Sequence, residues 1–155
     1  MKKGLILLAA LLFAGNAVAN ERATVDVNSA VSFSEQRSHV LADLADGETY
    51  AEISPEDREK VVSALDNIEK MLGSHASTQA LHPDTRVALV NEQETINNIL
   101  TRAHRDSRMV CSREIPVGTR MPTNVCRTVA ERRRLRDDSR QRLEGAGRSR
   151  NNSIL

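Results

Sequence analysis

Residues 54–73, SPEDREKVVSALDNIEKMLG, carry the clearest helix signal of the chain and set its fold class. Ser54 can accept hydrogen bonds from the free amides of a first turn, and Pro55 suits the first helical position. Apolar residues then recur at steps of four, three and four, and Gly73 follows the last of them: Val61, Leu65, Ile68 and Leu72. This pattern predicts an amphipathic helix that buries one face.

Two further helices are indicated on either side of this one. Between Glu35 and Asp46 the apolar residues lie close to helical spacing, and Gly47 follows as a C-cap. His82-Pro83-Asp84 opens a third helix, whose apolar face is formed by Leu89, Ile96, Ile99, Leu100 and Ala103. Since only a short polar segment joins the second helix to the third, we expect these two to pack antiparallel.

The character of the sequence changes after residue 107. RMVCSRE (108–114) and TNVCRT (123–128) are short β-like runs, and the loop between them is punctuated by Pro116, Gly118 and Pro122. Each run carries one of the two cysteines of the chain, Cys111 and Cys126. A metal site or a reactive thiol is the alternative, but two lone cysteines with no adjacent histidine do not make a tetrahedral zinc set. We therefore predict a disulfide. By closing a loop in the unfolded chain, it should stabilise the fold by roughly 3 kcal/mol.

The last part of the chain is rich in arginine. Thr128 and Glu131 have capping-box spacing and predict the start of a final helix, in which Leu135 and Leu143 are the only large apolar anchors. Residues 145–155 are rich in Gly, Ser, Asn and Arg, and we expect a flexible tail there. Residues 20–34 are expected to form an extended or disordered lead-in, which leaves a single small domain over residues 35–144.

These elements together predict a mainly α fold with a minor β part. It consists of an antiparallel helical hairpin, a disulfide-closed β-hairpin-like loop and a charged C-terminal helix. Between residues 20 and 155 the chain has 29 Leu, Ile, Val and Phe residues, roughly a fifth of the total, so its core must be thin.

The first nineteen residues have the features of a cleaved export signal. Met1-Lys2-Lys3 is positively charged, residues 5–14 are apolar, and Ala17-Val18-Ala19 supplies small residues at a cleavage site. The apolar run is too short to cross a bilayer, so a membrane anchor is disfavoured. We predict cleavage between Ala19 and Asn20 and a periplasmic or secreted protein, in a compartment that permits disulfides.

The net charge of +1 conceals two oppositely charged parts. Residues 20–100 contain fifteen acidic and six basic residues, whereas residues 101–155 contain six acidic and fourteen basic ones, all arginine. The two parts could neutralise each other within one fold, or the last helix could be a solvated charged face. Alternatively, the arginines dock an acidic protein or an anionic envelope polymer. The candidate partner-binding residues are Arg113, Arg120, Arg127, Arg132, Arg133, Arg134, Arg136 and Arg140.

Catalytic and cofactor signatures are weak in this sequence. The four histidines form no metal-binding pair at helical spacing, and no glycine-rich phosphate loop is present, so we predict neither a metal nor a cofactor. Export and the scarcity of aromatic residues argue against nucleic acid. We predict a non-catalytic interaction protein of the cell envelope. The alternatives are a small envelope hydrolase that uses carboxylate chemistry and a structural or stress-related envelope protein.

One block of the sequence resembles a known pattern. VCSRE (110–114), Gly118-Thr119 and Cys126-Arg127-Thr128 are similar to the Cys-x-Arg-Glu, Gly-Ser/Thr, Cys-Arg-Thr block of small uncharacterised exported proteins of Gram-negative bacteria. The resemblance implies a periplasmic or secreted location and a Cys111–Cys126 pair, and it brings no activity or ligand. On this block, Glu114 and Arg127 are expected to face each other across the hairpin in a structural role.

Overall fold

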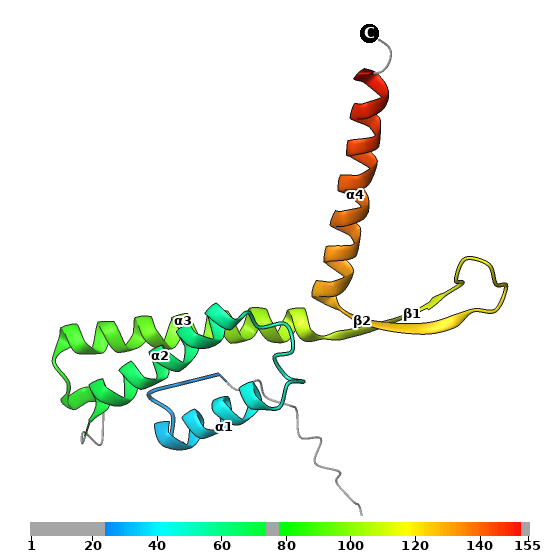
Figure 1. The fold of residues 1–155 in the computed structure, drawn as a ribbon. Helices are drawn as coiled ribbons and strands as arrows, with labels where there is room; N and C mark the ends of the chain where they lie inside the picture. The colour runs from blue at the N-terminus through cyan, green and yellow to red at the C-terminus, as the bar shows by residue number, and fades with distance from the viewer. Residues whose placement is uncertain (1–23, 74–77, 153–155) are drawn as a thin grey trace, which may run out of the picture.

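A computed structural model describes residues 24–73 and 78–152 of the chain. It contains, in order, α1 (Phe33–Ala45), α2 (Pro55–Leu72), a short 3-10 turn (Thr78–Ala80), α3 (Pro83–Ser107), β1 (Met109–Glu114), β2 (Thr123–Thr128) and α4 (Val129–Asn152). The predicted fold class, mainly helical with one small β-hairpin, is confirmed. Figure 1 shows that α1, α2 and α3 form a body from which the hairpin and α4 project in different directions.

Helices α2 and α3 lie side by side and run in opposite directions, as the short connection predicts (Figure 1). The Ser54 hydroxyl accepts a hydrogen bond from the Asp57 amide at 3.1 Å, and Gly73 ends α2 with a positive φ of 49°. Residues of both predicted apolar stripes are buried between the helices: Val61, Leu65, Ile68, Leu89, Ile96, Ile99, Leu100 and Ala103. The stripes therefore form the main interface of the body.

The core also includes residues that precede α1. Val25 is only 1% exposed, and its backbone N–H and C=O both bond to the side chain of Asn97, each at 2.8 Å. The Val27 amide donates to Gln93 at 2.9 Å. Residues 24–32 form no helix or strand, and Val25 and Val27 among them pack against the core. The predicted signal peptide (1–19) lies outside the described residues.

The hairpin follows the body without a linker. Only Arg108 separates α3 from β1, and α4 begins at the residue after β2. The strands pair antiparallel with Cys111 opposite Cys126 and Val110 opposite Arg127. The Val129 amide donates to the Arg108 carbonyl at 3.0 Å, so the two ends of the hairpin are held together where α4 starts.

Helix α4 leaves the body after its first turn. Ala130 is buried, whereas every residue from Arg133 to Gly145 is exposed. The helix then continues to Asn152, past Gly145, where a tail was predicted to begin. Two glycines cost about 1 kcal/mol each in a helix, and the alanine and arginines around them favour it. Within the described ranges, the structure has no helix long and apolar enough to span a bilayer.

Candidate functional site

The hairpin is closed by the predicted disulfide. Cys111 and Cys126 are bonded with an S–S distance of 1.99 Å, and they occupy directly opposite positions of the two strands. Both residues are exposed. The cross-link therefore fixes the strand pairing outside the hydrophobic core, in an element that two strands alone would hold weakly.

A second clasp lies on the other face of the hairpin. Two guanidinium nitrogens of Arg127 donate to the two carboxylate oxygens of Glu114 at 2.6 and 3.2 Å, and the Ser112 hydroxyl also donates to Glu114 at 3.0 Å. These hydrogen bonds, those of Arg127 first, lower the pKa of Glu114 below its ordinary value. The predicted facing of Glu114 and Arg127 is confirmed, and their contact is a structural one.

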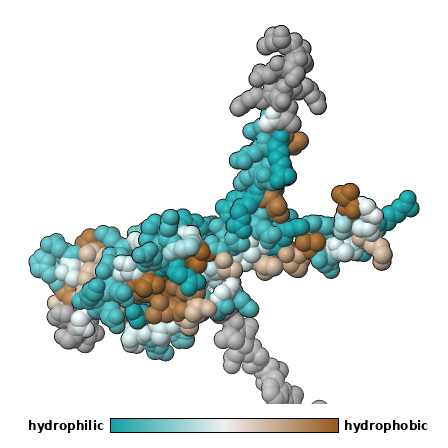
Figure 2. Space-filling view, in the orientation of Figure 1, coloured by the Kyte–Doolittle hydropathy of each residue, from teal (hydrophilic) through white to brown (hydrophobic). Residues whose placement is uncertain are grey.

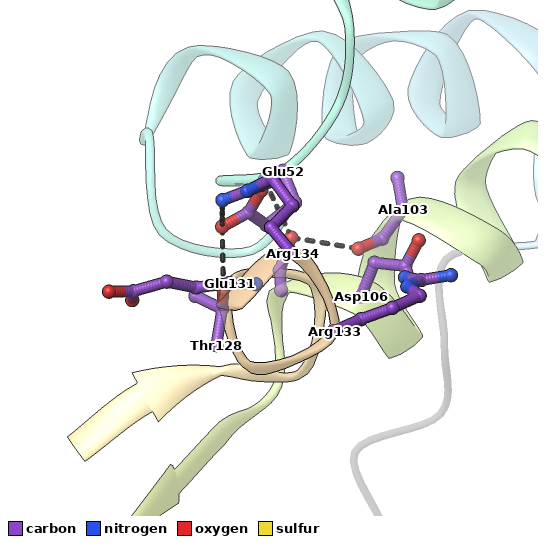
Figure 3. A network of polar contacts seen from close by, with 8 residues as sticks. Glu52, Ala103, Asp106, Thr128, Glu131, Arg133 and Arg134 are labelled. Carbon is purple, nitrogen blue, oxygen red and sulfur yellow. Dashed lines mark hydrogen bonds and ion pairs between the residues drawn. The ribbon is translucent and has the colours of Figure 1, made fainter. Parts of the chain in front are cut away.

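The base of α4 is anchored by a residue from the loop between α1 and α2. The Glu52 carboxylate receives two hydrogen bonds from Arg134, at 2.7 and 3.2 Å, and one from the Thr128 hydroxyl (Figure 3). Hydrogen bonding from Arg134, and then from Thr128, lowers the pKa of Glu52. Thr128 Oγ1 also accepts from the Glu131 amide at 3.0 Å, as the capping-box spacing predicts.

Two more contacts tie the end of α3 to this junction. Arg133 pairs with Asp106 at 2.6 Å, and Figure 3 shows this pair beside the Glu52 group. The backbone amide of Glu52 donates to the buried Ser107 hydroxyl at 2.9 Å, which donates in turn to the Ala103 carbonyl at 2.7 Å. Neither Glu52 nor Asp106 was predicted from the sequence to pair with an arginine of the last helix. The opposite charges of the two parts of the chain gave only the general expectation that such pairs form.

The eight predicted partner-binding arginines fall into two groups. Arg127, Arg133 and Arg134 are used internally, in pairs with Glu114, Asp106 and Glu52. The other five make no ion pair with any residue that the structure describes: Arg113, Arg120, Arg132, Arg136 and Arg140. Arg132 lies near enough to Glu114 to help lower the pKa of that carboxyl. The predicted Arg-rich face is therefore split between anchoring contacts and outward-facing charges.

Three of these five form what we call the arginine row. Arg132, Arg136 and Arg140 follow at steps of four along α4 and so lie on one side of it. The helix neighbours of Arg136, three and four positions away on both sides, are Arg132, Arg133, Ser139 and Arg140. No carboxylate occupies any of these positions. Like charges at this spacing destabilise a helix by a few tenths of a kcal/mol per pair, and this applies most to Arg136, because Arg140 also has Asp137 and Glu144 three and four positions away.

The titratable groups of the body and hairpin show one consistent trend. The carboxyl groups whose pKa is clearly shifted are Asp46, Glu52 and Glu114, and hydrogen-bond donors lower the pKa of each. A lowered pKa keeps a carboxylate ionised for pairing and disfavours it as a proton donor. Across residues 24–73 and 78–152, no group of three or more His, Cys, Asp or Glu side chains is placed to hold a metal ion.

Comparisons of the chain with protein-family models, with curated proteins and with solved structures gave no match.

Proposed function

We propose that this chain is a non-catalytic interaction protein of the cell envelope and that the arginine row of α4 binds an acidic protein surface or an anionic envelope polymer. The observation that carries the proposal is the row itself. Its three arginines share one side of a helix that leaves the body after one turn, and Arg136 has no carboxylate three or four positions away in either direction. Guanidinium groups pair well with carboxylates and phosphates, so a row of them suits a polyanion.

The anchoring contacts at the base of α4 support the same proposal. Glu52 and Asp106 pair with Arg134 and Arg133, which orients the helix relative to the body before any partner arrives. Because α4 is already oriented, less conformational entropy is lost when a partner binds, and this favours affinity. The arginines at the base of α4 pair with residues of the body, whereas Arg136 and Arg140 lie further along the helix and are exposed to solvent.

Export is part of the proposal. The features of residues 1–19, the resemblance of the cysteine block to exported proteins of Gram-negative bacteria, and an exposed disulfide all fit an oxidising compartment outside the cytoplasm. Mass spectrometry of the protein from the periplasmic fraction tests this part: a chain beginning at Asn20 supports it, and an intact Met1 terminus contradicts it.

Binding can be tested with fluorescently labelled polyglutamate, a probe for acidic polypeptide, and with a labelled phosphorylated polysaccharide. We expect Arg136→Gln/Arg140→Gln to weaken binding about tenfold and to reduce its salt dependence. The matched control is Arg86→Gln/Arg105→Gln, which removes the same charge from two exposed arginines of α3. Equal losses in both variants would show that net charge and not the row drives binding, and no binding of either probe would refute the proposal.

A further inference from the structure

The turn at the end of the hairpin exposes apolar side chains that nothing in the body covers. Ile115 is 65% exposed, Val117 is fully exposed and Met121 is 76% exposed. We call residues 115–122 the hairpin tip. Figure 2 shows hydrophobic atoms at the far end of the hairpin, beside hydrophilic ones and away from the body. Three of the few large apolar residues of this chain are therefore exposed within seven positions of the hairpin turn, a grouping that suits a contact surface.

The turn within the tip is shaped by local hydrogen bonds and one glycine. The Thr119 amide donates to the Pro116 carbonyl at 3.2 Å, and the Met121 amide donates to the Thr119 hydroxyl at 3.0 Å. Gly118 has a φ of +89°, which a residue with a side chain adopts poorly. The Cys111–Cys126 bond holds the strands behind this turn.

The charges around the tip have one sign. The only carboxylate between residues 107 and 130 is Glu114, which Arg127 and Ser112 already bind. Arg113 precedes the tip and Arg120 lies within it; both are exposed and make no ion pair within the part of the chain that the structure describes. The end of the hairpin therefore combines three apolar side chains with two uncompensated positive charges.

We propose that the hairpin tip binds an anionic lipid surface, with the apolar side chains in the interfacial layer and Arg113 and Arg120 at the headgroup phosphates. Apolar side chains bordered by cations match the two layers of such a surface. A protein partner would have to supply a shaped pocket for a tip at the end of a two-stranded ribbon, whereas a lipid interface accepts it without one. This inference uses a surface distinct from the arginine row and stands whether or not α4 binds a polyanion.

The test is flotation of the oxidised protein with vesicles of phosphatidylcholine and phosphatidylglycerol, compared with vesicles of phosphatidylcholine alone. We expect flotation with the anionic vesicles and about tenfold less with the neutral ones. Val117→Ser/Met121→Ser should reduce flotation about tenfold, because it removes two apolar side chains that would enter the interfacial layer. Since both side chains are exposed, their replacement should leave the fold intact. The matched control is Val87→Ser/Val90→Ser, which changes two exposed valines of α3 and should float like the unaltered protein.

Three results would overturn this inference. The first is an unaltered protein that does not float with anionic vesicles. The second is a Val117→Ser/Met121→Ser variant that floats as well as the control. The third is flotation that is lost in Arg136→Gln/Arg140→Gln but kept in the tip variant, since lipid would then bind to α4 as another polyanion. Loss in the tip variant together with retained polyglutamate binding separates the two surfaces.

Discussion

The side-chain amide of Asn97 pairs with the backbone of Val25 in both directions. Its Oδ1 accepts from the Val25 amide and its Nδ2 donates to the Val25 carbonyl, each at 2.8 Å. The amide group thus takes the place of a neighbouring strand for one residue of the segment before α1. Val25 itself is buried in the core, so this pairing fastens the beginning of the described chain to the middle of α3.

Removal of this pairing is expected to destabilise the body. In Asn97→Ala, the N–H and C=O of Val25 lose their partners at a half-buried position. We expect the free energy of unfolding, measured with urea, to fall by about 1–3 kcal/mol. Asn98→Ala is the control, because Asn98 is exposed and adjacent on the same helix, and it should change stability little. Equal effects of the two substitutions would contradict a specific role for Asn97.

Glu52 is expected to control the attachment of α4. Glu52→Ala removes the acceptor of Arg134 and Thr128, and we expect a loss of about 1–3 kcal/mol in the free energy of unfolding. The exposed Glu48 of the same loop provides the control Glu48→Ala. Amide hydrogen exchange should also speed up at residues 129–134 in the Glu52 variant. Unchanged exchange there would show that the chain connection alone holds the helix.

The same carboxylate predicts sensitivity to acid. The pKa of Glu52 is lower in the folded protein than its ordinary value of 4.5, so the unfolded chain binds the proton more readily. Its stabilising contribution is present above pH 4.5 and is lost as the pH falls through the folded pKa. Stability measured against pH should therefore decline less steeply below pH 4.5 in Glu52→Gln. A variant with the same slope as the unaltered protein would be inconsistent with this contact.

Tyr50 predicts a response at alkaline pH. It is 5% exposed, and burial, followed by the charges of Asp43 and Asp46, raises its pKa from 10.0 to about 12. The stabilisation that comes from burying the neutral phenol is complete below pH 10.0. It is lost as the pH rises through the folded pKa, and the total loss is about 3 kcal/mol. Tyr50 is the only tyrosine and the chain has no tryptophan, so tyrosinate absorbance reports this group alone. A midpoint near 10.0 would contradict its burial, and Tyr50→Phe should remove the alkaline loss.

The disulfide is expected to protect the hairpin and to leave the core intact. In Cys111→Ser/Cys126→Ser, we expect trypsin to cleave after Arg113 on the order of a hundredfold faster, because a cross-link worth about 3 kcal/mol no longer opposes strand opening. Initial cleavage after Arg120, in the exposed turn, serves as the internal control and should change little. The fluorescence of buried Tyr50 should be unaltered. A change of the Tyr50 fluorescence in the serine variant would instead show that the core depends on the hairpin.

The sequence predicts the elements of this protein well where the signal is local. Ser54 and Gly73 bound a helix because capping depends on adjacent residues, and Cys111 and Cys126 fall opposite each other in runs of equal length. The contact of Val25 with Asn97 spans 72 residues, and that of Glu52 with Arg134 spans 82. No local pattern encodes such pairs. The extension of α4 past Gly145 was missed because glycine only weakens a helix, whereas a proline would have ended it.

The hairpin is joined to α3 and to α4 with almost no linker residues. A single residue separates α3 from β1, none separates β2 from α4, and the Val129–Arg108 hydrogen bond closes the junction. Together with the Glu52–Arg134 and Asp106–Arg133 pairs, this junction couples the direction of the hairpin to that of α4.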